Sequence, residues 1–187
     1  MDDDAHLMAQ VQRGELEAFE QLVRRYGGAL YAFFVRLGSS PADAEDLMQD
    51  TFLRVFKARA TFDSQRPLSP WLYGIATHVW VDEQRQRRGA RATAAGGAPV
   101  VEEPAATAMD DVAAQAERRD MTRHIEEAMH QLPEDHRLVL ILRHFHGLSY
   151  EGISQALGIS MGTVKSRIHY ALAELREELR RWGLLEA

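Results

Sequence analysis

The chain has 187 residues and no cysteine, which excludes disulfides, thiolate zinc sites and thiol redox sensing. Its 45% hydrophobic content suits one or two small globular domains, and its formal net charge is −6. No stretch approaches the roughly 20 apolar residues of a membrane span, and the acidic start MDDDAHLMAQ is unlike a signal peptide, so we expect a cytoplasmic protein without membrane insertion.

Apolar residues at helical spacing predict three helices in the first part of the chain. A short stripe at 7–11 marks the first helix, and a long stripe at 19–37 marks the second. Ser40 as N-cap and Pro41 in the first turn begin the third, whose apolar residues recur as far as Phe56. Its opposite face is polar, and solvation is the simplest interpretation of these residues: Asp43, Asp46, Asp50, Arg54 and Lys57.

A loop leads to a fourth helix, which is predicted to begin near Ser69 and Pro70. Its inward face is expected to carry Trp71, Leu72, Ile75, Ala76 and Val79. Its remaining face carries Thr77, His78, Trp80, Val81 and Arg85, and it ends in an arginine cluster of Arg85, Arg87, Arg88 and Arg91. Aromatic rings interleaved with cations suit single-stranded DNA, because unstacked bases lie on flat side chains while cations follow the backbone. For Trp71, Tyr73 and Phe62 taken singly, however, core packing is the favoured interpretation.

Composition changes sharply after the fourth helix. From Gly89 to about Asp111 the chain reads GARATAAGGAPVVEEPAATAMDD, which is rich in Ala, Gly and Pro and contains no aromatic residue. Such a segment predicts a flexible linker. We therefore expect an all-α protein, with two small helical domains at 1–88 and 112–187 joined by a flexible linker at 89–111.

The segment 148–175 has the pattern of a helix-turn-helix. Ser149 caps a short helix that Gly158 ends, and Ser160 caps a second helix with one apolar face. The other face gathers donors and cations: Thr163, Lys165, Ser166, Arg167, His169 and Tyr170. A recognition helix presents such groups to base edges and phosphates in the major groove of DNA. An ordinary pair of antiparallel helices with a solvated face is the alternative interpretation.

The net charge of −6 is unusual for a protein that binds DNA tightly by itself, because phosphate neutralisation supplies most non-specific affinity. Cations gather in the arginine cluster and in the second helix of the helix-turn-helix, whereas carboxylates gather near the N-terminus and at 43–50. This asymmetry indicates two kinds of partner, one a nucleic acid and the other a protein.

No metal site, cofactor site or active site is expected. His144 and His146 lie two residues apart, whereas metal-binding pairs on a helix lie three or four apart, and no carboxylate completes a set with the other nearby histidines: His124, His130 and His136. The sequence contains no phosphate-binding glycine loop, no nucleophile elbow and no HExxH. We therefore predict a protein that is not an enzyme and uses no metal or cofactor.

Four blocks follow one another along the chain: GELEAFEQLVRRY, DAEDLMQDTFLRVFKA, WLYGIATHVWVDEQRQRR and QLPEDHRLVLILRHFHGLSYEGISQALGISMGTVKSRIHYALAEL. They resemble, in order and spacing, the extracytoplasmic-function (ECF, group 4) sigma factors of the sigma-70 family. The first three resemble region 2 and the last resembles region 4. The resemblance implies a bacterial transcription factor that binds core RNA polymerase, through the β′ clamp helices and the β flap, and directs it to promoters. Promoter DNA and an anti-sigma factor are the other partners that it implies.

The resemblance also assigns site residues. It places core polymerase on one helical stripe, in place of the solvated-face interpretation: Asp43, Glu45, Asp46, Gln49 and Asp50. It places the −10 element, whose unstacking costs a few kcal/mol per base, on Phe62, Asp63, Ser64, Gln65, Thr77, His78, Val81, Arg85 and Arg88. It places the −35 element on Thr163, Lys165, Ser166, Arg167, His169 and Tyr170. A good bidentate base contact there contributes roughly 1–3 kcal/mol of discrimination.

The chain departs from the most frequent residues of the family at four positions. His78 stands where Asn is most frequent, which leaves the preferred −10 base open. Tyr170 stands where Arg is common, which removes a usual guanine reader or phosphate clamp. Gly152 and Ser154 replace the frequent Glu and Ala, and Gly152 is expected to weaken its helix by up to about 1 kcal/mol relative to Ala.

Two other functions would use part of this pattern. A conventional regulator that uses the helix-turn-helix alone would bind promoters stably without polymerase. A sigma mimic that titrates an anti-sigma factor would not need DNA-facing residues in both domains. This chain has cations in both: Arg85, Arg87, Arg88, Lys165 and Arg167.

Overall fold

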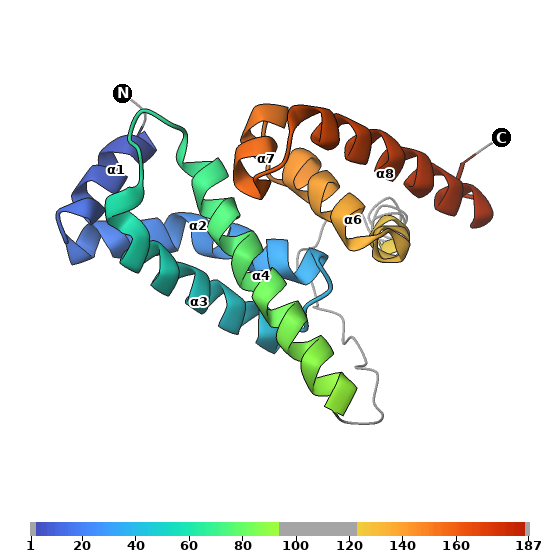
Figure 1. Ribbon diagram of the computed structural model, residues 1–187, viewed down its shortest axis with the longest axis horizontal. Coiled ribbons are helices and arrows are strands. Elements are labelled where there is room, and N and C mark those ends of the chain that lie inside the picture. The colour runs from blue at the N-terminus through green and yellow to red at the C-terminus, as the bar shows by residue number, and fades with distance from the viewer. Residues whose placement is uncertain (1–2, 94–122, 186–187) are drawn as a thin grey trace, which may run out of the picture.

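The computed structural model describes the backbone of residues 3–93 and 123–185, and these residues are helical without any strand (Figure 1). The all-α prediction is therefore confirmed. Most of the linker predicted at 89–111 lies outside the described residues, and its first residues continue the fourth helix to Thr93. Among the described helices, none combines the length and the apolar character needed to cross a membrane.

The N-terminal helices follow the predicted order. They are α1 (Asp3–Gln12), α2 (Leu16–Arg36), α3 (Pro41–Ala58), the short 3₁₀ helix η1 (Arg59–Thr61) and α4 (Leu68–Thr93). The predicted cap of α3 is confirmed, because the Ser40 hydroxyl accepts a hydrogen bond from the Asp43 backbone N–H at 3.2 Å. Leu22, Phe33 and Phe34 of the long stripe are fully buried. Periodicity and caps thus defined this half of the molecule.

The C-terminal helices contain the predicted helix-turn-helix. A helix at 123–131 precedes α6 (Glu134–Leu140), a π-helical turn η2 (Ile141–Phe145), α7 (Tyr150–Leu157) and α8 (Met161–Arg181). Ser149 and Ser160 cap α7 and α8 through their hydroxyls, and Gly158 ends α7 with a φ of 64°. A positive φ favours glycine because a side chain would strain that conformation. The helix-turn-helix is therefore confirmed down to its caps.

Helix α4 is buried on two sides, which the periodicity did not predict. Leu72, Tyr73 and Val79 lie in the core as expected, but Thr77 and Trp80 are buried as well. Thr77 and Trp80, which the periodicity placed on the remaining face, are therefore covered as well. Figure 1 shows the reason: α4 lies between the bundle of α1–α3 and the C-terminal helices, where it packs on both α3 and α7.

The N-terminal and C-terminal helices share one continuous core, and we call their meeting surface the interdomain contact. Helices α4 and α7 approach so closely that a Cβ on Gly74 would lie 3.1 Å from the Ala156 carbonyl oxygen. Polar and cation–π contacts cross the same boundary: Tyr73 Oη with His146 Nδ1 at 2.6 Å, Arg88 to Glu134 at 2.6 Å, Arg137 to the Leu37 carbonyl at 3.2 Å, and Arg36 over the Phe145 ring at 4.4 Å. The two groups of helices therefore pack as one unit.

Candidate functional site

The polar stripe of α3 contains two carboxylates that pair with arginines and three residues that are exposed to solvent. Asp43 and Asp50 are half-buried, and each accepts a hydrogen bond from an arginine. Glu45, Asp46 and Gln49 are exposed on the same helix. Leu53, one turn beyond Gln49, is 58% exposed. It adds an apolar side chain to an otherwise polar face of the helix. The stripe thus presents carboxylates, an amide and an apolar side chain together to an approaching partner.

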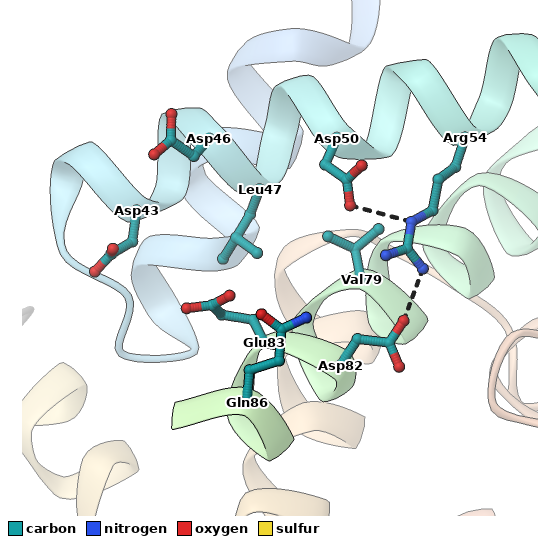
Figure 2. A pocket seen from close by; sticks show the side chains of 9 residues that line it. All are labelled: Asp43, Asp46, Leu47, Asp50, Arg54, Val79, Asp82, Glu83 and Gln86. Carbon is teal, nitrogen blue, oxygen red and sulfur yellow. Dashed lines mark hydrogen bonds and ion pairs between the residues drawn. The ribbon is translucent and has the colours of Figure 1, made fainter. Parts of the chain in front are cut away.

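An acidic groove separates α3 from α4, and Figure 2 shows its lining: Asp43, Asp46, Leu47, Asp50, Arg54, Val79, Asp82, Glu83 and Gln86. Arg54 bridges the two helices, with its guanidinium 3.1 Å from Asp50 and 2.8 Å from Asp82. The Arg54 contact lowers the pKa of the Asp82 carboxyl below its usual value. The groove therefore stays negatively charged at neutral pH.

Arg87 forms a second bridge between α3 and α4. Its guanidinium lies 2.5 Å from Asp43 and 2.6 Å from Glu83. Mainly because of this hydrogen bond, the pKa of Asp43 is lowered. Arg54 and Arg87 together fix the polar stripe of α3 relative to the C-terminal half of α4.

The arginine cluster predicted at the end of α4 separates into different environments. Arg87 turns toward α3, and Arg88 pairs with Glu134 of α6. Arg85 is the open member, with its side chain 75% exposed and 3.9 Å from Asp82. The Arg91 side chain lies outside the described part of the chain. Sequence grouping alone therefore overstates the cation density that α4 presents to solvent.

The loop between η1 and α4 has a buried base and an exposed tip. Phe62 is buried, and its ring centre lies 5.2 Å from that of Trp71. Asp63, Ser64 and Gln65 are exposed, and the Asp63 carboxylate accepts a hydrogen bond from the Gln65 backbone N–H at 3.0 Å. This Asx turn shapes the tip, while the aromatic pair holds its base.

Neighbouring positions of α4 differ in their access to solvent. The buried Thr77 hydroxyl donates to the Tyr73 carbonyl at 2.8 Å. His78 is exposed, and Val81 is half-buried one turn further on. In this conformation, the exposed members of the predicted −10 group are therefore the loop tip, His78, Arg85 and Arg88.

The polar face of α8 is open. Lys165, Ser166, His169 and Tyr170 are exposed, whereas Thr163 and Arg167 are half-buried. Arg167 pairs with Asp135 of α6 at 2.5 Å. The Tyr170 ring lies nearly parallel to that of His136, with ring centres 6.4 Å apart. A single face of α8 thus offers a cation, two rings and hydroxyl groups at the spacing of a recognition helix.

Comparison with known proteins decides the family. The family model of sigma-70 region 2 matches residues 22–90, and that of sigma-70 region 4 matches residues 128–177. The ECF RNA polymerase sigma factor SigW of Bacillus subtilis is 30% identical over 178 residues, which cover 91% of this chain and 94% of SigW. The chain belongs to the ECF sigma factors of the sigma-70 family. Region 2 thus includes most of α2, all of α3 and most of α4, and region 4 includes α6, α7 and most of α8.

Other sigma factors are similar over most of their length. RNA polymerase sigma factor CarQ of Myxococcus xanthus is 34% identical over 172 residues, covering 92% of this chain and 95% of CarQ. Among solved structures, CnrH in complex with the cytosolic domain of CnrY is similar with a TM-score of 0.72, at 28% identity over 96% of this chain and 99% of CnrH. The sigma factor RpoE of Bartonella quintana, in complex with the anti-sigma factor NepR, is similar with a TM-score of 0.71, at 28% identity over 87% of this chain and 96% of that one.

The structure gives a role to Gly152 and Ser154, two positions at which the sequence was expected to depart from other ECF sigma factors. Gly152 is buried, and a Cβ there would lie 3.1 Å from the Cγ of Pro70, so the absence of a side chain permits the interdomain contact. The Ser154 hydroxyl donates to the Ile159 carbonyl at 2.6 Å and closes the turn of the helix-turn-helix. Both substitutions thus have a structural role beyond local helix propensity.

The histidines of this sigma factor are dispersed. His136 pairs with Glu174 at 2.8 Å, and His130 contacts Arg137 at 3.1 Å. His144 is exposed, whereas His146 contacts the rings of both Phe33 and Tyr73. In the part of the chain that the structure describes, no three of its histidines and carboxylates gather as metal ligands.

His146 makes the interdomain contact sensitive to acid. Burial, together with the nearby Arg36 charge, lowers the pKa of His146 from 6.5 to about 4. A solvated histidine takes up its proton near pH 6.5, so the contribution of neutral His146 to stability is complete above that pH and is lost as the pH falls toward 4. Because the ring is only partly buried and partly screened by solvent, we expect this loss to be on the order of 1–2 kcal/mol between pH 7.5 and 5.

We therefore expect the thermal unfolding midpoint of the wild-type protein to fall more steeply between pH 7.5 and 5 than that of His146→Phe, which keeps an aromatic ring that does not titrate. Circular dichroism melts of both proteins across this range measure the difference. Parallel curves would rule out His146 as the titrating group.

Proposed function

We propose that this ECF sigma factor docks on core RNA polymerase through α3 and directs transcription initiation by reading both promoter elements. The polymerase carries out phosphodiester chemistry, and the sigma factor itself catalyses no reaction. It acts where the polymerase acts, in the cytoplasm. The observation that carries the proposal is the presence of regions 2 and 4 on one chain, each with an open polar surface.

The residue assignments form part of the proposal. Polymerase contacts Asp43, Glu45, Asp46, Gln49 and Asp50, of which Asp46 and Gln49 are the exposed centre. The −10 element contacts Asp63, Ser64, Gln65, His78, Val81, Arg85 and Arg88, with Phe62 supporting the loop and Thr77 becoming accessible only if α4 loses part of its cover. The −35 element contacts Thr163, Lys165, Ser166, Arg167, His169 and Tyr170.

The rival functions explain fewer of these observations. A regulator that uses its helix-turn-helix alone has no need for region 2, which matches over residues 22–90. A mimic that only binds an inhibitor has no need for the exposed face of α8. Stable promoter binding without polymerase is the result that would favour the regulator.

An anti-sigma factor is the second protein partner that we propose. CnrH and the Bartonella quintana RpoE were both solved with a protein bound, and NepR is described as an anti-sigma factor. The exposed carboxylates of α3 and the open face of α8 give such an inhibitor two surfaces whose occupation would block polymerase and DNA.

Two ion pairs support the prediction that the free protein binds DNA only weakly. Arg88 of region 2 and Arg167 of region 4 are held by adjacent carboxylates, Glu134 and Asp135. These cations must leave their carboxylates before they contact phosphates, and the chain as a whole carries a net charge of −6. Polymerase is therefore needed to bring both regions to a promoter.

Run-off transcription tests the function directly. Core polymerase is incubated with and without the protein on genomic fragments that include the region upstream of its own gene. Specific transcripts that require the protein would support the proposal. The proposal would be wrong if no fragment gave such a transcript and the protein alone bound a fragment stably.

Replacing Lys165 and His169 together with alanine should change the −35 preference. Each exposed side chain lies on the face of α8 that meets base edges, and loss of a good base contact removes discrimination of about tenfold or more. Run-off rates on promoters with single −35 substitutions measure this change, with Ala173→Ser on the same helix as the control. An unaltered ranking of all promoter variants would contradict the assignment of α8.

A further inference from the structure

Gln12, the last residue of α1, joins the N-terminal helix to the turn before the −10 loop. Its side-chain amide donates to two backbone carbonyls, Arg59 at 3.0 Å and Phe62 at 2.9 Å. The Arg59 carbonyl belongs to the first residue of η1, and the Phe62 carbonyl belongs to the residue that follows η1. One amide group therefore fixes both ends of this turn. Gln12 thereby connects to residues that follow it by 47 and 50 positions in the sequence.

The support beneath Gln12 is itself fixed. Met8 and Val11 of α1 are fully buried in the N-terminal core. Asp4, one helical turn before Met8, pairs with Arg25 at 2.6 Å and accepts a hydrogen bond from Tyr26 of α2. Because α1 is held at both ends, the side chain of its last residue can hold η1 in a fixed position.

The loop beyond this turn depends on its base for its shape. Phe62 is buried against Trp71, and the exposed tip begins at the next residue, Asp63. The Arg59 side chain adds a hydrogen bond to the Phe56 carbonyl at 2.6 Å on the other side of the turn. Since the tip residues are exposed, their direction is set mainly by where this base lies.

We propose that Gln12 is a positioning residue for recognition of the −10 element: it holds the base of the loop 62–65 so that Asp63, Ser64 and Gln65 present a fixed surface to an unstacked base. Gln12 itself contacts no DNA. The inference rests on the proposed function, since it assigns a role within −10 recognition. It makes α1, which precedes the matched region 2, part of the promoter-reading apparatus.

The test uses Gln12→Glu and Gln12→Leu in the full-length chain with core polymerase. Glutamate keeps the size of the side chain but cannot donate to two carbonyls when ionised, and leucine removes the polar group. Gln10→Glu makes the same chemical change on the same helix and serves as the matched control. Promoter opening is followed by fluorescence of 2-aminopurine in the −10 element, on promoters with single substitutions at −10 or at −35.

Both Gln12 variants should lose about three- to tenfold of the discrimination among −10 bases, as expected for hydrogen bonds of ordinary strength. Discrimination among −35 bases, co-elution with polymerase and the behaviour of Gln10→Glu should remain those of the wild type. If the −10 discrimination of the Gln12 variants returned on cooling as their folded fraction recovered, the role of Gln12 would be purely structural. That result would overturn the inference.

Unchanged −10 discrimination in both variants, or an equal loss at −10 and −35, would also overturn it. These results are distinct from failure of the proposed function, in which the wild-type protein would give no promoter-dependent transcript. In that case the role of Gln12 in −10 recognition would be rejected with it.

Discussion

Replacing Asp46 and Gln49 with alanine should weaken association with core polymerase by about tenfold to hundredfold, because central interface residues commonly contribute more than 1 kcal/mol each. Both side chains are exposed on α3, between the tethered Asp43 and Asp50. Their removal leaves the arginine bridges to α4 in place. The loss should therefore appear in binding and not in the folding of region 2.

Co-elution with core polymerase and fluorescence anisotropy of the labelled protein measure this loss. Glu17→Ala with Gln21→Ala removes one carboxylate and one amide from the exposed face of α2 and is the matched control. Thermal melts should show similar midpoints for both double variants. If the Asp46 and Gln49 variant bound polymerase as tightly as the control, α3 would not be the docking helix.

Gly74→Leu should separate region 2 from region 4. A Cβ at this position would already lie 3.1 Å from the carbonyl oxygen of Ala156, so a leucine side chain cannot be accommodated without moving α7. Overpacking of this kind costs about 1–3 kcal/mol. The equilibrium between packed and separated regions should therefore shift by about 5- to 150-fold toward separation.

Single-molecule fluorescence energy transfer measures this separation well, because the chain has no native cysteine and accepts a dye pair at introduced sites. Glu17 on α2 and Arg176 on α8 are exposed positions for the dyes. Gly28→Leu is the control, since a Cβ at Gly28 meets nothing within 4 Å. A transfer distribution that did not change with Gly74→Leu would contradict a close α4–α7 contact in solution.

Local rules predicted much of this fold. The caps at Ser40, Ser149 and Ser160 were readable because each places a hydroxyl three residues before a free backbone N–H. Gly158 was readable because the turn needs a left-handed residue. These features depend on neighbours within one helical turn, and so the sequence contains the whole of the relevant information.

Contacts between distant segments could not be predicted in this way. The periodicity of α4 gives one buried face, yet Thr77 and Trp80 are also buried because the helix packs between two sets of partners. Arg87 resembles Arg85 in sequence context, but its partner Asp43 lies on another helix. Gln12 was likewise unremarkable, since its acceptors are backbone carbonyls about fifty residues away.

The neighbouring carboxylates of α6 also act as built-in counterions. Glu134 and Asp135 each neutralise an arginine from a different region, Arg88 and Arg167. If those arginines transfer to phosphates as proposed, the DNA releases condensed cations, while the two vacated carboxylates attract cations from solution. Part of the ion release is thereby cancelled. On this proposal, the slope of log affinity against log salt concentration should understate the number of arginines that touch the promoter.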